Sequence, residues 1–141
     1  LDRARFFVDE WAKPWQDEHN GSFDDQLWMY GLQFEAYDKY FRLTGDKESA
    51  RYNLRALDAM IAEQEGDGKW KAASGLSGIC LAGYGYAYDY TGEAQYLRRG
   101  LDLLERTTEA SGDRVKTFAQ QFRASPYFLR TLVIGYQPDR L

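Results

Sequence analysis

Apolar residues recur along most of this chain with the spacing of an α-helix. In residues 47–65 and 93–110, apolar stripes repeat at every third or fourth position, with polar residues between them. The two stripes comprise Ala50, Leu54, Leu57, Ile61, Leu97, Leu101 and Leu104. Such a stripe is typical of a helix with one face buried and the other in water. No segment shows convincing alternation with the period of two that a half-buried β-strand would give, so we expect an all-α fold.

The same reasoning predicts six helices. They cover residues 2–12, 25–43, 47–65, 75–90, 93–110 and 114–135. The segments 27–43 and 75–90 are apolar almost all the way round, which is typical of inner helices that other helices surround. Pro126 should make the last helix kink or restart. The four glycines within residues 75–85 are costly inside a helix, so they indicate either a close neighbouring helix or room for a ligand.

The length and composition are those of one globular domain covering residues 1–141. The chain is 44% hydrophobic and 28% charged, which is enough for one sizeable core but not for two. Its net charge of −4 argues against a surface that follows nucleic-acid phosphates. Charged residues and glycines interrupt every apolar stretch well before the roughly 18 residues that a membrane span needs. We therefore expect neither a nucleic-acid nor a membrane partner.

Cysteine and histidine are too scarce for two common kinds of site. The chain has one cysteine, Cys80, and one histidine, His19. A single cysteine cannot form an internal disulfide, and the pair cannot supply the three or four ligands of a Cys/His zinc cluster. No cofactor or metal is expected. The chain begins inside an expected helix, which suggests an excised fragment or a mature product and leaves its cellular location open.

Two stretches of the chain repeat one another. Each has a Thr-Gly pair followed by an acidic residue, then Ala-x-Tyr and, five positions after the tyrosine, Leu-Asp; they lie within residues 40–58 and 88–102. The Thr-Gly pairs are 47 positions apart (91 − 44). A repeat of this length, read as helix end, turn and next helix, is typical of stacked α-hairpins that bury one another's apolar faces. It predicts a single domain of antiparallel α-hairpin repeats.

These turn motifs resemble the hairpin repeat of the (α/α)-toroid proteins. That superfamily includes six-hairpin glycosidases, unsaturated-uronide hydrolases, sugar epimerases and helical polysaccharide lyases. The resemblance covers roughly residues 27–136 and implies a partial toroid of about three hairpins, where a closed toroid typically has five to seven. It also implies that a saccharide lies in the cleft formed by the inner helices and their N-terminal loops. A chain of three hairpins suggests part of a larger enzyme, half of an oligomeric ring or a non-catalytic remnant.

The connections between the expected helices differ in length. Tight turns at 44–46 and 91–92 alternate with the longer connections 13–24, 66–74 and the shorter 111–113. In an antiparallel array, alternate connections emerge at opposite ends, so the latter three should share one face. Loops on a rigid scaffold are common places for binding and catalysis. We therefore expect the functional site on this loop face.

The first of these loops contains candidates for acid–base chemistry. Asp24 and Asp25 are candidate catalytic carboxyls for glycosidic cleavage, which needs two such groups about 5 to 10 Å apart. His19 is a candidate proton-transfer group because its ordinary pKa lies near neutrality. Each has a simpler interpretation: Asp24, or Ser22, can cap the next helix, and His19 can be plain polar surface. Asp17 and Glu18 add further carboxyls to the same loop.

Candidate substrate-binding residues are aromatic or cationic. They are Trp15, Trp28, Trp70, Lys71 and Arg123. The tryptophans offer flat apolar surfaces for sugar rings, although Trp70 can equally cap the core. Arg123 can bind a substrate carboxylate bidentately, and an ion pair with Glu35 or Asp89 explains it as well. We expect a carbohydrate-active domain of a hydrolase or polysaccharide lyase, with a non-catalytic helical scaffold that binds a protein as the alternative.

Overall fold

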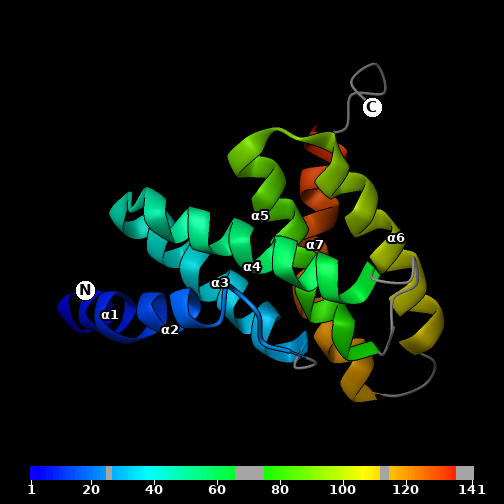
Figure 1. Ribbon diagram of the computed structural model, residues 1–141. Coiled ribbons are helices and arrows are strands. Elements are labelled where there is room, and N and C mark those ends of the chain that lie inside the picture. The colour runs from blue at the N-terminus through cyan, green and yellow to red at the C-terminus, as the bar shows by residue number, and fades with distance from the viewer. Residues whose placement is uncertain (25–26, 66–74, 112–114, 136–141) are drawn as a thin grey trace.

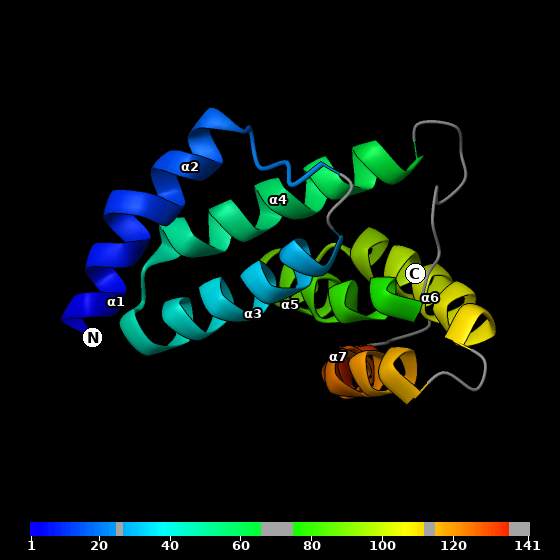
Figure 2. The same cartoon turned by 90° about the horizontal axis from the view of Figure 1, so that it is seen from below.

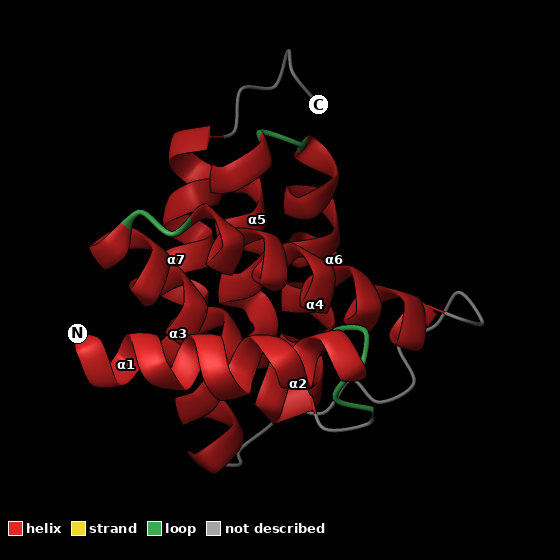
Figure 3. Ribbon diagram, turned by 60° about the vertical axis from the view of Figure 1, so that its left-hand side comes forward, coloured by secondary structure: helices red, strands yellow, loops and turns green. Residues whose placement is uncertain are grey.

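The described part of the chain consists of helices joined by short turns and loops. The computed structural model describes residues 1–24, 27–65, 75–111 and 115–135, and no strand occurs among them (Figure 3). The elements are α1 (Asp2–Phe7), a π-helical turn (Val8–Ala12), α2 (Lys13–Glu18), α3 (Leu27–Thr44), α4 (Lys47–Glu65), a 3₁₀-helix (Gly75–Cys80), α5 (Leu81–Thr91), α6 (Ala94–Ser111) and α7 (Val115–Gly135). The expected all-α class is confirmed.

The first helix is longer than its sequence indicates. Residues 2–18 form one continuous helical run, whereas we expected a loop from Lys13 onward. Pro14 lies in the first turn of α2, directly after the π-helical turn. A proline is tolerated at such a position because the loosened turn before it leaves room for the ring and tolerates the absence of the backbone N–H that proline lacks. The prediction that the loop begins at residue 13 is therefore wrong.

The two Thr-Gly turns have the same structure, as the repeat predicts. Gly45 and Gly92 have φ angles of +74° and +73°, which glycine adopts without steric cost. Each glycine N–H donates to a carbonyl four residues back, Phe41 and Tyr88, at 2.7 Å. In both turns the threonine hydroxyl also accepts from the backbone N–H two residues on. The two turns thus end α3 and α5 in the same way.

The core forms where α3, α5 and their neighbours meet. Its fully buried side chains include Tyr30, Phe34, Leu57, Met60, Leu81, Tyr84, Leu97, Leu103 and Phe128. A Cβ on Gly83 would lie 2.4 Å from the ring of Phe34, so a close neighbour explains this glycine. Every residue from Leu81 to Ala87 is buried, which confirms α5 as an inner helix. Helix α3 differs, because Trp28, Leu32 and Leu43 are exposed.

The helices are arranged as an array in which α5 is central (Figures 1 and 2). Helix α5 contacts α3 and α4, which precede it, and α6 and α7, which follow it. The N-terminal helix contacts α4 through α2 and lies on the opposite side of the array from α7. Helix α7 runs unbroken through Pro126, so of the two expected outcomes, a kink or a restart, the restart does not occur. No described helix is both long and apolar enough to cross a membrane.

Candidate functional site

The structure brings the rings of Trp15 and His19 together at the end of the N-terminal helix. The two rings stack with centroids 4.1 Å apart, and Phe23 stacks on Trp15 at 4.7 Å. The His19 Nδ1 donates to the Trp15 carbonyl at 2.8 Å, which leaves Nε2 as the acceptor. Asp24 follows Phe23, is exposed, and donates its backbone N–H to the Ser22 hydroxyl at 3.0 Å. Because α3 begins at Leu27, neither Ser22 nor Asp24 is the residue directly before it.

The other carboxyls of this segment have different surroundings. Asp17 accepts from Arg55 at 2.8 Å and from the Tyr52 hydroxyl at 2.9 Å. These two hydrogen bonds lower the pKa of Asp17, so it acts as a fixed anion that holds α2 against α4. Glu18 is exposed. The remaining loop candidates, Asp25, Trp70 and Lys71, lie outside the described residues.

Arg123 is held by an ion pair with α3. Its Nε and Nη2 donate to the two carboxylate oxygens of Glu35 at 2.9 and 2.6 Å, in the bidentate geometry that suits a guanidinium. Burial alone would raise the pKa of Glu35, but the hydrogen bond and charge of Arg123, with help from Lys39, lower it. The ion pair with Glu35, one of the two pairings that the sequence indicates, is therefore the one observed. Trp28, two turns before Glu35 on α3, is 46% exposed.

A second group of polar residues lines a cleft of about 600 Å³ between α3, α5 and α7. Its lining, which we call the polar cleft, consists of Asp38, Lys39, Arg42, Tyr86, Tyr88, Asp89, Tyr127, Arg130, Thr131, Ile134 and Gly135. All of these residues come from the C-terminal halves of their helices except Tyr86, which lies at the middle of α5. The cleft therefore lies toward the opposite ends of α3 and α5 from the loop face on which we expected the site.

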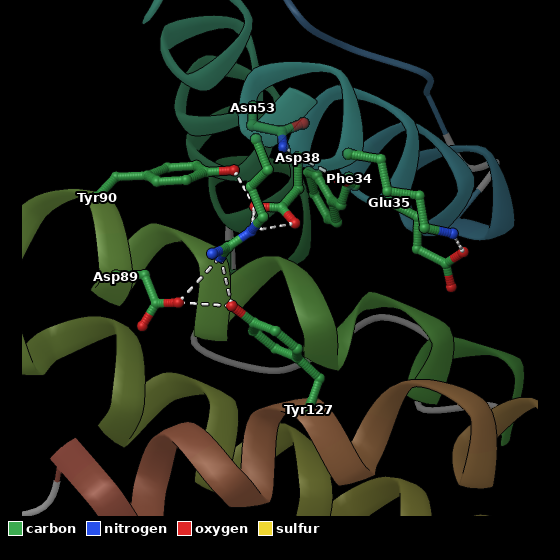
Figure 4. Close-up of polar contacts among 9 residues, drawn as sticks. Phe34, Glu35, Asp38, Asn53, Asp89, Tyr90 and Tyr127 are labelled. Atoms are coloured by element: carbon green, nitrogen blue, oxygen red, sulfur yellow. Dashed lines mark hydrogen bonds and ion pairs between the residues drawn. The ribbon is translucent and has the colours of Figure 1, made fainter. Parts of the chain in front are cut away.

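Arg42 joins the three helices of the polar cleft. Its Nε donates to both oxygens of Asp38, at 2.8 and 3.0 Å, and its Nη2 reaches Asp89 at 3.1 Å and the Tyr127 hydroxyl at 2.6 Å. The Tyr127 hydroxyl in turn donates to Asp89 at 2.5 Å. The Tyr90 hydroxyl donates to Asp38 at 2.7 Å. Figure 4 shows Asp89 and Tyr127 converging from α5 and α7, with Tyr90 reaching across to Asp38.

The surroundings of this network keep its tyrosines neutral and its arginine charged. Burial, followed by the hydrogen bond to Asp89, raises the pKa of Tyr127. Burial and the hydrogen bond to Asp38 likewise raise the pKa of Tyr90, and burial raises that of Tyr86 to about 12. The hydrogen bond to Asp38 raises the pKa of Arg42. The tyrosines are therefore neutral hydrogen-bonding groups at pH 7, suited to orienting a ligand and poorly suited to removing a proton.

One cation of the polar cleft is not used within the described part of the chain. Arg130 is exposed on α7, and no described carboxylate pairs with it. Lys39 is also exposed and contacts Glu35 at 3.5 Å, the longest of the ion pairs here. Nearby, the rings of Tyr86 and Tyr127 pack with centroids 4.5 Å apart. The cleft therefore offers positive charge beside aromatic surface.

The residues of the polar cleft left a weak signal in the sequence. Asp38 and Arg42 are four positions apart on α3, and Tyr127, Arg130 and Ile134 follow the same helical spacing on α7. A helix that is apolar all round except for a few charged residues is the pattern that could have located the cleft residues. Which helices bring these positions together was not deducible from spacing, because it depends on the packing of three segments up to 97 residues apart (135 − 38).

A second concave surface lies between the N-terminal helix and α3. This apolar groove, also of about 600 Å³, is lined by Phe7, Val8, Trp11, Ala12, Trp15, Phe23, Met29, Leu32, Gln33, Ala36 and Tyr37. Phe7 and Trp11 are 62% and 64% exposed. The groove lies on a different face of α3 from the polar cleft, and Gln33 is its one amide side chain. Its chemistry is that of a surface that contacts other apolar groups.

The chain was compared with models of known protein families, with curated proteins and with solved structures, and none of the three comparisons found a match. The resemblance to (α/α)-toroid proteins therefore depends on the turn motifs alone. Among the described residues, no three His, Cys, Asp or Glu side chains come together in a way that could hold a metal ion. The polar cleft is the candidate site whose side chains are best suited to a small polar ligand.

Proposed function

We propose that this chain is a carbohydrate-active domain that binds a uronate-containing saccharide in the polar cleft. The observation that carries the proposal is Arg130, an exposed guanidinium that lines the same cleft as Tyr86 and Tyr127. A guanidinium matches the two oxygens of a sugar carboxylate, and tyrosine rings offer apolar surface with a hydroxyl at the edge. The cleft volume of about 600 Å³ is within the range of small-molecule sites.

The network around Arg42 would serve as a rigid wall for this ligand. Its donors and acceptors are already satisfied by one another, so few side chains have to be ordered when a saccharide enters. Hydrolase or lyase chemistry is the reaction class implied by the resemblance to toroid proteins, and it is a proposal by analogy. Reducing-end release would reveal hydrolysis, and formation of an unsaturated uronate would reveal elimination.

The test is calorimetric titration of the folded chain with matched neutral and uronate oligosaccharides. We expect selective binding of the uronate series, weakened by added salt because charges attract. Arg130→Gln should raise the dissociation constant at least about tenfold, since it removes a charge-assisted bidentate contact. Arg98→Gln, an exposed arginine on α6, is the matched control and should bind as the parent does.

The same titration tests where the saccharide binds. Trp70→Ala should abolish binding if the site is on the loop face that the sequence indicates, and should leave it unchanged if the site is the polar cleft. Binding that is insensitive to Arg130→Gln would contradict the cleft. A folded parent chain that binds neither series would contradict the saccharide function itself.

The alternative function, a helical scaffold that binds a protein, is favoured by one specific observation. The apolar groove exposes large side chains that another polypeptide would cover, including Phe7 and Trp11. The two functions use different residues. Substitutions in the groove should therefore change contacts with other chains without changing the affinity for saccharide.

A further inference from the structure

We propose that the apolar groove binds helix α7 of a second copy of this chain, so that copies associate head to tail. This inference rests on the scaffold function and is independent of saccharide binding, because its residues lie outside the polar cleft. The two ends of the helix array share one feature. Large exposed apolar side chains gather at both ends, on the N-terminal helix at one and on α7 at the other.

Helix α7 has three distinct faces. The buried face carries Ala124 and Phe128, and the face toward the polar cleft carries Tyr127, Arg130, Thr131 and Ile134. The third face is formed by positions four, seven and eleven residues after its first member. It comprises Phe122, Pro126, Leu129 and Val133, all exposed, with Val133 at 76%. We call it the α7 edge stripe.

The arrangement around α5 shows how a second copy would cover this stripe. Helix α5 is packed on both sides, against α3 and α4 before it and against α6 and α7 after it. Helix α7 has the corresponding pair of preceding neighbours, because it contacts α5 and α6. The N-terminal helix and α3 of another copy present an open groove between them and would supply the second pair. Docking α7 there would repeat the packing that already surrounds α5.

The charges of the two ends are complementary. Residues 2–18 carry five acidic against three basic side chains, and Glu10 and Glu18 are exposed. Residues 115–135 carry Lys116, Arg123 and Arg130 and no acidic residue, although Arg123 is already paired with Glu35 of α3. Opposite net charges favour contact between unlike ends and disfavour contact between two like ends. A head-to-tail contact also uses both surfaces, and such heterologous contacts generate rings or open chains of copies.

The experiment measures mass in solution, by sedimentation velocity over a roughly hundredfold range of concentration. We expect the parent chain to self-associate. Trp11→Glu in the groove and Val133→Glu in the α7 edge stripe should each weaken association at least about tenfold, because each places a charge in an apolar contact. Leu43→Glu is the matched control: Leu43 is 72% exposed at the end of α3, outside both surfaces, and should associate as the parent does.

Mixing the two defective variants separates this pairing from the alternatives. Val133→Glu retains an intact groove and Trp11→Glu an intact edge stripe, so an equimolar mixture should regain association through one unaltered contact. If two grooves paired with each other instead, adding Val133→Glu would not restore a contact to the altered groove of Trp11→Glu. A parent that stays monomeric at every concentration, or a mixture that does not associate, would overturn the inference. Far-ultraviolet circular dichroism confirms that each variant is folded, and saccharide titration of the same samples reports separately on the proposed function.

Discussion

The polar cleft and the apolar groove both border α3, yet they differ in how far their side chains are satisfied by contacts within the chain. In the cleft, Asp38, Arg42, Asp89 and Tyr127 satisfy one another across three helices. In the groove, Phe7 and Trp11 stay largely in contact with solvent. The hydrogen bonds of the cleft are formed within one chain and leave a small polar space, whereas the groove leaves apolar area exposed to solvent.

Because of this difference, the two surfaces should contribute to stability in different ways. Buried charges cost free energy unless they keep their partners, so the cleft should be sensitive to single polar substitutions. Exposed apolar side chains have little to lose on truncation in a monomer. Three of the following four substitutions test this contrast, and Glu35→Gln tests the ion pair between α3 and α7; they are ordered by decreasing effect and measured at concentrations where the chain is monomeric.

Arg42→Met should have the largest effect. It leaves Asp38, whose side chain is only 5% exposed, with Tyr90 as its remaining donor, and we expect a loss of about 3 kcal/mol in the free energy of unfolding. Urea titration measures the loss. Arg130→Met, in the same cleft but without a described ionic partner, should cost under about 0.5 kcal/mol. Similar losses for the two variants would show that the Arg42 network does not stabilise the cleft.

Tyr90→Phe should have a smaller effect in the same network. It removes the hydroxyl that donates to Asp38 at 2.7 Å while keeping the ring, so we expect a loss of about 1.5 kcal/mol. Tyr86→Phe is a suitable control, because Tyr86 lines the cleft without donating to Asp38. Thermal and urea unfolding measure the loss of unfolding free energy in both variants. A larger loss for Tyr86→Phe than for Tyr90→Phe would be the contrary result.

Glu35→Gln should change how stability depends on pH. The net effect of Arg123 and Lys39 places the pKa of Glu35 below its ordinary value of 4.5. A carboxyl with a lowered pKa in the folded state stabilises the fold above the unfolded-state value, and this contribution is lost as pH falls through the folded-state value. The parent should therefore lose up to about 1 kcal/mol more than Glu35→Gln as pH falls from 5 to 3. Parallel acid-unfolding curves for the two would contradict the ion pair.

Trp11→Ser should have the smallest effect. Trp11 is 64% exposed, so its removal should change the unfolding free energy of the monomer by under about 0.5 kcal/mol. The same urea titration measures it. A loss above about 2 kcal/mol would mean that the groove belongs to the folded core of one chain, and the contrast between the two surfaces would then disappear.

Local sequence signals located the helices well. The expected segment 47–65 has the bounds of α4, and the two Thr-Gly turns end their helices with the positive φ that glycine permits. The buried face of α6 was less predictable. Leu101 belongs to the expected apolar stripe but is exposed, while Leu103 is fully buried. The reason lies in another segment, because the Phe128 ring packs where a side chain on Gly100 would stand.

The candidate site was less accessible to sequence reasoning than the fold. Arg123 was proposed to bind a substrate carboxylate, with an ion pair to Asp89 or Glu35 as the alternative, and the structure shows the pair with Glu35. Trp15 and His19 were expected in a loop and instead belong to the end of the N-terminal helix, where they stack. Arg42 and Tyr127 were not singled out, because neither has a distinctive neighbour in sequence. Their meeting depends on the packing of α3 and α7, because the two residues lie 85 positions apart along the chain.

By itself, the sequence determined the helical class, most helix bounds and the repeated turns, because these depend on neighbours three or four residues away and on the freedom of glycine. The tertiary structure decided which polar residues share a cleft and which apolar residues stay exposed. Those outcomes depend on how whole helices pack against one another. Packing of α3, α5 and α7 brings Asp38, Asp89 and Tyr127 within reach of one guanidinium, and no spacing along the chain encodes that meeting.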